Sequence, residues 1–207
     1  MFSGIVEEVG RIDGVDRAGG RVRVGCGEVL RGARRGDSIA VDGCCLTLAD
    51  FISGGFVADV MPETLARTTL GARDAGAAVN LEAAMRHDGR VGGHLVTGHV
   101  DGTGTVGALR PDGNASWVTI TAPPELLALL VEKGCVAVDG ISLTVVGVDS
   151  AGFAVSLIPH TLERTTAATW QPGSRVNLEA DLVAKYVMRG LATHLGAARS
   201  AVLAAEG

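Results

Sequence analysis

The chain has 207 residues, which is enough for two domains that each bury a modest core. Its formal net charge of −5 argues against a nucleic-acid-binding protein, because phosphate recognition needs clustered positive charge. The dense basic stretch at residues 31–35 is interpreted as a solvated helix face. No signal peptide or membrane span is expected, because the start has no basic region and the longest apolar run covers only residues 126–131.

The cysteines and glycines give two further expectations. Cys26, Cys44, Cys45 and Cys135 lack the spacing of a disulfide framework or a zinc site. We therefore expect a cytoplasmic protein with reduced thiols. The 30 glycines and an aromatic content of 3% predict many tight turns rather than a large aromatic core.

The chain contains an internal duplication. Three segments recur at one offset of 97 residues: AVDGCCLT (40–47) as AVDGISLT (137–144), PETLARTT (62–69) as PHTLERTT (159–166), and VNLEA (79–83) as VNLEA (176–180). Of the 21 paired positions, 17 are identical, far above a chance identity of roughly one in fifteen to twenty. Two copies of about one hundred residues match the usual size of a domain. Two equivalent pockets would suit a protein that holds two similar molecules.

In chain order, short β-rich runs separated by Gly, Asp and Asn dominate both copies. The runs are residues 4–9, 22–25, 38–48, 55–60 and 78–83, and then 98–106, 116–121, 136–148, 153–158 and 175–180. Such spacing predicts a mainly β fold with a small antiparallel barrel or sandwich in each copy. Residues 125–133, between Pro124 and Gly134, are predicted to form a helix, and residues 28–35 are a weaker match for one.

The end of the chain has no counterpart in the first copy. From residue 184 its apolar positions recur every three or four residues, at Val187, Leu191, Leu195, Ala198, Val202 and Ala205. This spacing predicts a helix, weakened by Gly190 and Gly196. It could pack on its own barrel, but we favour a contact between subunits, because the stripe lies outside both copies. The expected domains are residues 1–97, 98–186 and 187–207, with a short join near residues 92–97.

Strand alternation places two small polar side chains on one face in each copy. Cys45 and Thr47 share a face after Gly43, and Ser142 and Thr144 share one after Gly140. A ligand lying across such a strand could take hydrogen bonds from it. The alternative is that these residues fill a tight barrel interior. Because the pattern occurs in both copies, we favour the ligand.

The PxTLxRTT segment is the second candidate. Pro62 and Pro159 suit the first turn of a helix, which leaves free N–H groups for a polar ligand. Thr64 and Thr161 can donate their hydroxyls. The alternative is a capped one-turn helix that only joins two strands.

The two copies differ at titratable positions. His99 replaces Ile5, Ser142 replaces Cys45, His160 replaces Glu63, Asp181 replaces Ala84, and Lys133 replaces Gly36. One site can therefore act as an acid or base where the other cannot. His87 and His194 are expected to be structural. Metal binding by His94 and His99 is not expected, because their spacing suits neither a strand face nor a helix face.

Longer motifs give the sequence a family resemblance. They are MFSGIVEE, GDSIAVDGCCLTL, MPETLARTTLG, VNLEAAM, GGHLVTGHVDG, KGCVAVDGISLTVV, LIPHTLERTT and VNLEADLVAKYVMR, in this order. Together they resemble the riboflavin synthase family, whose chains carry tandem lumazine-binding repeats, and they cover nearly the whole chain. Three positions depart from the family pattern: Ser3 stands where Thr is commoner, Asp42 where Asn is usual, and Ala83 where Arg is frequent.

The resemblance implies two Greek-key barrels of six antiparallel strands and a C-terminal helix that holds a homotrimer. It implies a transferase without a cofactor, in which two molecules of 6,7-dimethyl-8-ribityllumazine exchange a four-carbon unit and give riboflavin and 5-amino-6-(ribitylamino)uracil. The active site is expected between the N-terminal barrel of one subunit and the C-terminal barrel of its neighbour. An association with lumazine synthase stays open.

The resemblance also implies site residues. The first site is expected to comprise Gly4, Ile5, Val6, Cys45, Leu46, Thr47, Asp59, Val60, Met61, Pro62, Glu63 and Thr64. The second is expected to comprise Gly98, His99, Val100, Ser142, Leu143, Thr144, Ile158, Pro159, His160, Thr161, Leu162 and Glu163. Lys133 is expected to reach a ligand on the neighbouring chain. The residues expected to influence turnover are Phe2, Ser38, Cys45, Thr47, His99, Ser142, Thr144 and Asp181.

For the mechanism, we expect His99 to work with Ser142 and Thr144 in removing a proton from the methyl group of one lumazine. Cys45 and Thr47 would hold the other, which water attacks. A covalent role for Cys45 is not expected, because no base is adjacent to it in sequence. Two alternatives are a non-catalytic lumazine or flavin antenna protein, and a flavin-reductase-like barrel. The second lacks a nicotinamide-binding domain, and the catalytic set argues against the first.

Overall fold

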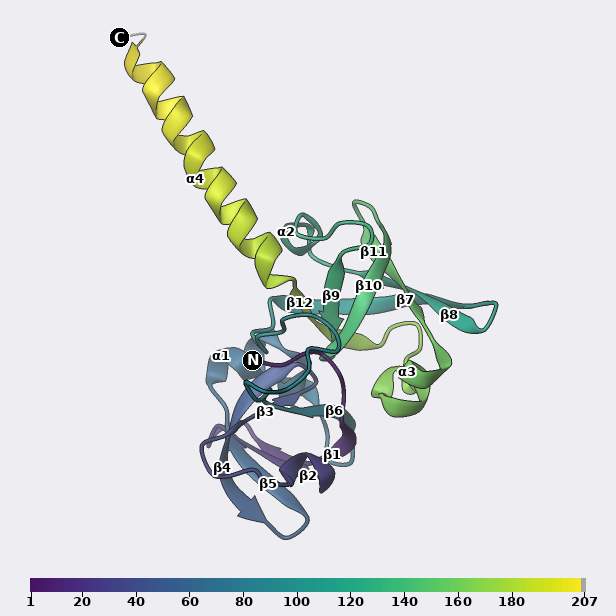
Figure 1. The fold of residues 1–207 in the computed structure, drawn as a ribbon. Helices are drawn as coiled ribbons and strands as arrows, with labels where there is room; N and C mark the ends of the chain where they lie inside the picture. Colours follow the sequence, from purple (N-terminus) through teal and green to yellow (C-terminus); the bar gives the residue numbers. More distant parts are fainter. Residues whose placement is uncertain (206–207) are drawn as a thin grey trace.

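Two closed antiparallel barrels of six strands each are followed by one long helix (Figure 1). The structure is a computed structural model that describes the backbone of residues 1–205 and the side chains of residues 1–194. The prediction of a mainly β fold, with two tandem six-stranded barrels and a C-terminal helix, is confirmed.

The two barrels share one strand order, with each barrel closed by its first and last strands. The first comprises β1 (Glu8–Asp16), β2 (Arg21–Gly25), η1 (Glu28–Leu30), β3 (Ser38–Val41), β4 (Cys44–Ile52), β5 (Gly55–Asp59), α1 (Pro62–Arg67), η2 (Thr69–Ala72) and β6 (Ala78–Ala83). The second comprises β7 (Gly102–Asp112), β8 (Ala115–Thr121), α2 (Pro124–Leu127), β9 (Cys135–Val138), β10 (Ile141–Val148), β11 (Gly152–Leu157), α3 (Pro159–Arg164), η3 (Thr166–Thr169) and β12 (Arg175–Ala180).

The two predicted helices inside the barrels are wrong in length. The segment 28–35 forms only the three-residue 3-10 helix η1, and α2 ends at Leu127. After α2 the chain turns back to the sheet. Leu130 is buried in the core, and the Lys133 N–H donates to the Val145 carbonyl on β10 at 2.8 Å, so this segment cannot continue the helix. Lys133 itself has a φ of 65°, which no helix allows.

The long β-runs 38–48 and 136–148 are hairpins rather than single strands. Asp42 and Gly43 form the first two-residue turn, with φ values of 45° and 78°, and Asp139 and Gly140 repeat both values in the second. Positive φ at both central positions is what the Asp-Gly pair favours in a hairpin turn. The turn fixes the register, so Ser38 pairs with Thr47.

This register separates apolar from polar side chains. In β4, Cys44, Leu46 and Leu48 pack in the core of the first barrel, whereas Cys45 is half-buried and Thr47 is exposed on the outside. In β10, Leu143 and Val145 are in the second core, whereas Ser142 is half-buried and Thr144 is exposed. The alternative in which these polar residues fill the barrel interiors is therefore wrong.

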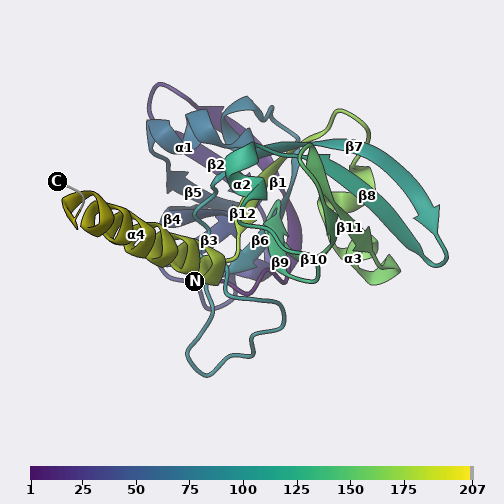
Figure 2. The same cartoon turned by 90° about the horizontal axis from the view of Figure 1, so that it is seen from above.

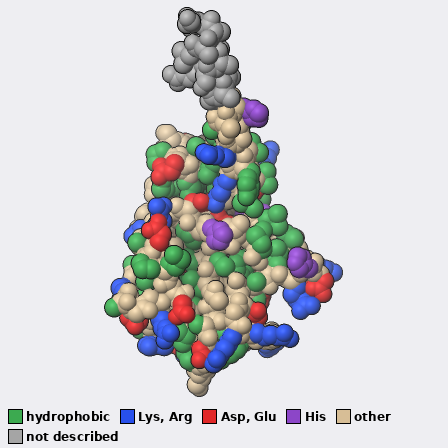
Figure 3. Space-filling view, turned by 90° about the vertical axis from the view of Figure 1, so that its left-hand side faces the viewer, with side chains coloured by type: hydrophobic (Ala, Val, Ile, Leu, Met, Phe, Trp, Pro, Cys, Tyr) green, Lys and Arg blue, Asp and Glu red, His purple; other side chains and the backbone are tan. Residues whose placement is uncertain are grey.

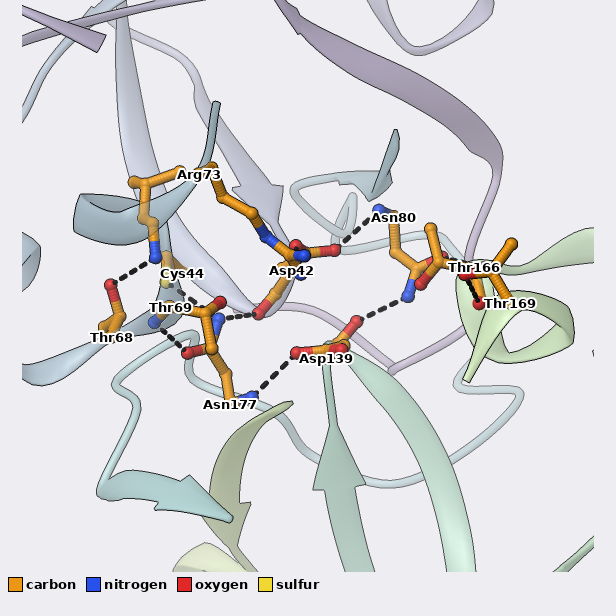
Figure 4. Close-up of polar contacts among 11 residues, drawn as sticks. Asp42, Cys44, Thr68, Thr69, Arg73, Asn80, Asp139, Thr166, Thr169 and Asn177 are labelled. Atoms are coloured by element: carbon orange, nitrogen blue, oxygen red, sulfur yellow. Dashed lines mark hydrogen bonds and ion pairs between the residues drawn. The ribbon is translucent and has the colours of Figure 1, made fainter. Parts of the chain in front are cut away.

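The two hairpin tips meet where the barrels contact each other (Figure 4). Asn80 Nδ2 donates to the Asp139 carbonyl at 2.9 Å, and Asn177 Nδ2 donates to the Asp42 carbonyl at 2.8 Å. Each Asn side-chain oxygen accepts a backbone N–H from the other barrel, at Thr166 or Thr69. We call this contact the seam and define it by Asp42, Gly43, Asn80, Asp139, Gly140 and Asn177. It places the two barrels in one nearly symmetric arrangement.

The helix α4 (Leu182–Ala205) extends away from both barrels (Figures 1 and 2). It begins before residue 187, the expected limit of the last domain. Tyr186, Val187 and Leu191 on it are exposed. The other predicted apolar positions, Leu195, Ala198, Val202 and Ala205, lie outside the described side chains.

The surface shows no concentration of one charge sign on the face drawn in Figure 3, where acidic and basic side chains alternate. Within the described residues, no helix is long and apolar enough to cross a membrane.

Candidate active site

The outer faces of β4 and β10 carry the candidate site residues. On the first barrel, Cys45 and Thr47 share their face with Ser38 and Ala40, their partners on β3. On the second, Ser142 and Thr144 share theirs with Ala137 and Cys135 on β9. Each barrel therefore presents a hydroxyl and a thiol next to a threonine, with the hydroxyl and thiol on opposite strands in the two copies.

Each face is crossed by a short segment from the other copy, so the two segments are exchanged between the barrels. The Ser142 N–H donates to the Gly4 carbonyl at 2.8 Å, and the Cys45 N–H donates to the Gly98 carbonyl at 2.9 Å. A Cβ on Gly4 would lie 2.7 Å from Ser142 Cβ, and a Cβ on Gly98 would lie 2.6 Å from Cys45 Cβ. Only glycine allows this approach, and both residues have positive φ.

The exchange corrects the expected grouping of site residues. Gly4, Ile5 and Val6 were expected beside Cys45, but they lie against the second barrel, where Val6 packs on its core. Gly98, His99 and Val100 lie against the first barrel, where Val100 packs on its core. The alignment of the copies shows which segments are equivalent, but not which barrel each one crosses.

For the same reason, the expected partnership of His99 with Ser142 and Thr144 does not occur within one chain. His99 follows Gly98 and belongs to the face of Cys45 and Thr47 within this chain. The equivalent position on the second face is Ile5. We call the two surfaces the first face (Cys45, Thr47, Gly98, His99 and Val100) and the second face (Ser142, Thr144, Gly4, Ile5 and Val6).

The PxTLxRTT segments begin α1 and α3 at the rims of these faces. Met61 and Ile158 are exposed immediately before the helices, and Glu63, His160 and Glu163 are also exposed. Asp59 pairs with Arg21, with 3.0 Å between Asp59 Oδ1 and Arg21 Nε, and Glu63 pairs with Arg67. Leu46, Leu143 and Val60 are buried in the cores, so only their backbones can meet a ligand.

His94 is an unexpected polar partner on the second face. Its Nδ1 lies 2.7 Å from Ser142 Oγ, while its buried Nε2 has no hydrogen-bond partner among the described residues. Burial lowers the pKa of His94, and nearby Asp181 opposes this effect only in part, so the ring is neutral at pH 7. No spacing in the sequence indicated this contact, because it joins a loop residue to a distant strand.

Two of the residues expected to affect turnover have structural partners. Phe2 is fully buried with Ala40, Val96 and Ala137, and its N–H donates to the Val96 carbonyl at 2.7 Å. Asp181 accepts the Val183 N–H at 2.9 Å and thereby caps α4. Any influence of Phe2 on turnover would act through the position of the segment that follows it.

Ser38 and Lys133 lie beside the two faces. Ser38 borders a cavity of about 780 Å³ that Ser3, Ile5, Met85 and Arg90 also line. Of the residues that define the two faces, only Ile5 lines this cavity, and the rest of each face stays open in the single chain. Lys133 is exposed in a left-handed conformation, where the first copy has Gly36.

The described residues contain no cluster of three or more His, Cys, Asp or Glu that could hold a metal ion. All four cysteines are free thiols. The site therefore consists of hydroxyl, thiol, imidazole and backbone groups, which can bind a polar ligand and move protons.

Two equivalent barrels with open polar faces define a tandem small-ligand-binding protein. The family model for the lumazine binding domain matches residues 3–84 and again residues 97–181. The chain is 48% identical to the riboflavin synthase of Actinobacillus pleuropneumoniae over 189 residues, covering 90% of this chain and 88% of that protein. It is 49% identical to the riboflavin synthase of Mycobacterium tuberculosis (strain H37Rv) over 197 residues, covering 91% and 97%.

A solved structure shows the same fold at lower identity. LumP complexed with riboflavin superposes with a TM-score of 0.80 at 23% identity, covering 87% of this chain and 99% of LumP. From the relatives and the two family matches, the chain belongs to the riboflavin synthase family.

Proposed function

We propose that this protein makes riboflavin from two molecules of 6,7-dimethyl-8-ribityllumazine. One molecule donates a four-carbon unit to the other, and the second product is 5-amino-6-(ribitylamino)uracil. The atoms of the two products equal those of the two substrates, so the reaction needs no oxidant, reductant or second substrate. The observation that carries the proposal is a pair of equivalent faces with different side chains, the thiol of Cys45 and the imidazole of His99 on one and the hydroxyl of Ser142 and the apolar Ile5 on the other.

The faces of one chain do not enclose a ligand. Thr47, Met61 and His99 on the first barrel are exposed, and so are Thr144 and Ile158 on the second. A homotrimer would close them by placing the first face of one subunit against the second face of its neighbour. The exposed Tyr186, Val187 and Leu191 of α4 support this assembly, because an isolated helix gains most of its stability from packing. Lys133 would then reach toward the neighbour's ligand.

Most of the rate enhancement would come from holding the two lumazines face to face. Proximity and orientation can lower a barrier by roughly 7–11 kcal/mol. His99 would accept a proton from the methyl carbon of the lumazine on the first face, leaving a carbanion. The carbanion would form a carbon–carbon bond to a ring C=N carbon of the lumazine on the second face, and the π electron pair of that C=N bond would move to its nitrogen, which takes up a proton. Ser142, hydrogen-bonded to neutral His94, would hold that second molecule. Proton transfer of this kind contributes typically 10²–10⁴-fold.

The free thiols indicate the cellular compartment in which the protein works. Four free cysteines without a disulfide suit a reducing compartment, so we infer that the enzyme works in the cytoplasm. An association with lumazine synthase stays a prediction.

The direct test mixes purified protein with 6,7-dimethyl-8-ribityllumazine and follows riboflavin by absorbance. One riboflavin should form for each two lumazines consumed. The exposed Glu125→Gln variant serves as a matched control that should keep full activity. Tight lumazine binding without any riboflavin would instead support a non-catalytic binding protein. Light scattering of the same sample should give the mass of three chains, and a monomer would contradict the inter-subunit site.

A further inference from the structure

The repeated VNLEA segment contains a residue pair that the proposed mechanism leaves unused. In β6 and β12 the Val and Leu side chains pack in the barrel cores, so strand alternation turns the Asn and Glu outward. The Asn residues belong to the seam. Glu82 and Glu179 are also almost fully buried, at 5% and 3% exposure, although each carries a carboxylate. A buried carboxylate needs several donors.

Each carboxylate receives its donors from one crossing segment. Glu82 Oε1 accepts the Ser3 N–H at 2.7 Å and the Ser3 hydroxyl at 2.8 Å, and Oε2 accepts the Gly4 N–H at 2.9 Å. Glu179 Oε1 accepts the Thr97 N–H and hydroxyl, both at 2.7 Å, and Oε2 accepts the Gly98 N–H at 2.9 Å. No ion pair to either carboxylate occurs within the described part of the chain. The two carboxylates therefore obtain their hydrogen-bond donors from the crossing segments, and the same hydrogen bonds hold the segments in place.

Because the two segments are exchanged between the barrels, each carboxylate holds a glycine that contacts the face of the opposite barrel. Glu82 is on the first barrel, but the carbonyl of the Gly4 that it holds accepts the Ser142 N–H on the second face. Glu179 is on the second barrel, but the carbonyl of the Gly98 that it holds accepts the Cys45 N–H on the first face. Ile5 and His99, which follow directly, take their positions from the same two glycines.

We propose that Glu82 and Glu179 are positioning residues that each set the ligand geometry on the opposite barrel. Glu82 controls the second face, and Glu179 controls the first. This inference rests on the proposed function, because it assigns a lumazine to each face.

Matched substitutions test the crossed pattern. In Glu82→Gln and Glu179→Gln the side chain keeps its shape, but its NH₂ group faces a backbone N–H donor in place of one carboxylate oxygen. Loss of one charge-assisted hydrogen bond should weaken lumazine binding about tenfold at one face and leave the other unchanged. Glu125→Gln on exposed α2 is the control and should leave both faces unchanged.

The readout must tell the faces apart. Isotope-labelled 6,7-dimethyl-8-ribityllumazine should give two bound NMR signals for each chain, which Thr47→Ala and Thr144→Ala assign to the first and second face. Glu82→Gln should shift and weaken the lumazine signal assigned to the second face. Glu179→Gln should do the same to the lumazine signal assigned to the first face. The reverse pattern would overturn the proposal, and so would equal changes at both signals.

A purely structural role gives a different result. Each variant would then lower the thermal unfolding midpoint while both lumazine signals kept their wild-type affinity, and this would also overturn the proposal. If a Gln variant fails to fold, Ser3→Ala and Thr97→Val remove only the hydroxyl donors and should show the same crossed pattern at a few-fold effect. Riboflavin formation by the wild type reports separately on the proposed function, so a wild type that binds two lumazines without converting them leaves the crossed pattern measurable.

Discussion

The seam and the two faces show opposite degrees of symmetry, although both were duplicated together. At the seam, Asn80 and Asn177 make the same hydrogen bonds, and Gly43 and Gly140 approach each other identically, with a Cβ on either glycine 2.8 Å from the other's nitrogen. On the faces, Ile5 and Cys45 of the first copy are replaced in the second copy by His99 and Ser142, respectively. A contact between two copies constrains both partners at once, whereas in the proposed function each face would meet its own ligand. The duplication therefore kept its scaffold and diversified its chemistry.

One position breaks the symmetry of the seam. Arg73 lies beside Asp42 (Figure 4), with 2.6 Å between Arg73 Nη2 and Asp42 Oδ2. Trp170 occupies the equivalent position beside Asp139. Both aspartates are 1% exposed, so two buried carboxylates share one guanidinium. Burial raises the pKa of both carboxyls, and for Asp139 the charge on Asp42 raises the pKa further, while Arg73 opposes the rise most directly at Asp42. Asp139 is therefore the carboxyl that keeps its proton more readily.

The largest expected effect on stability comes from removing Arg73, the cation beside the seam aspartates. Arg73→Leu leaves Asp42 buried without a partner, and we expect it to lower the free energy of unfolding by about 3 kcal/mol at pH 7. Chemical denaturation would measure this. The double variant Asp42→Asn with Arg73→Leu removes both charges and should recover most of the loss. An Arg73→Leu variant as stable as the wild type would show that the Arg73–Asp42 ion pair does not stabilise the seam.

Exchanging one residue between the faces should have the next largest effect. His99→Ile gives the first face the residue of the second, and we expect turnover to fall roughly 10–100-fold with a smaller change in lumazine affinity. Steady-state kinetics and fluorescence titration separate the two quantities. The equivalent Ile5→Ala changes an apolar contact only and should affect binding more than turnover. Unchanged turnover in His99→Ile would remove the imidazole from the mechanism.

The raised pKa values of Asp42 and Asp139 should appear in the pH dependence of stability. Because the folded-state pKa values of Asp42 and Asp139 are raised, their contribution is complete below the unfolded pKa of about 3.9 and is lost as pH rises through the folded values. Urea unfolding across this range should show a falling free energy. For Asp139→Asn the free energy of unfolding should fall less steeply, because one titrating carboxyl is gone, while the Asn side chain keeps the acceptor for the Asn177 N–H. An exposed control, Asp112→Asn, should match the wild type, and equal slopes for all three would contradict a raised pKa at Asp139.

The smallest expected effect concerns Lys133, which holds a φ of 65° where Gly36 holds 91°. Lys133→Gly should raise the free energy of unfolding by roughly 1 kcal/mol, because it relieves a backbone conformation that side chains disfavour. Turnover should fall if the ammonium group reaches the neighbour's ligand. The converse Gly36→Lys should cost a similar amount, since no atom lies within 4 Å of its Cβ to add a clash. A less stable Lys133→Gly would show that the side chain stabilises this turn.

Some of the site could be predicted from particular residues and some could not. Alternation along residues 44–48 correctly turned Cys45 and Thr47 away from the core, because the side-chain period of a strand is a local property. The two identical VNLEA segments indicated the duplication but assigned no role to Asn80 or Glu82. Their partners, Asp139 and Ser3, lie far away in sequence. No local pattern encodes such a contact.

By itself, the sequence determined the duplication, the mainly β barrels and the polar strand faces, because each follows from repetition or from local periodicity. Only the tertiary structure decided that Gly4 crosses to Ser142 and Gly98 to Cys45, and hence that His99 belongs with the first face. The crossing depends on how two finished barrels dock across the seam. That docking is set by buried hydrogen bonds between residues of different barrels, which exist only after both have folded.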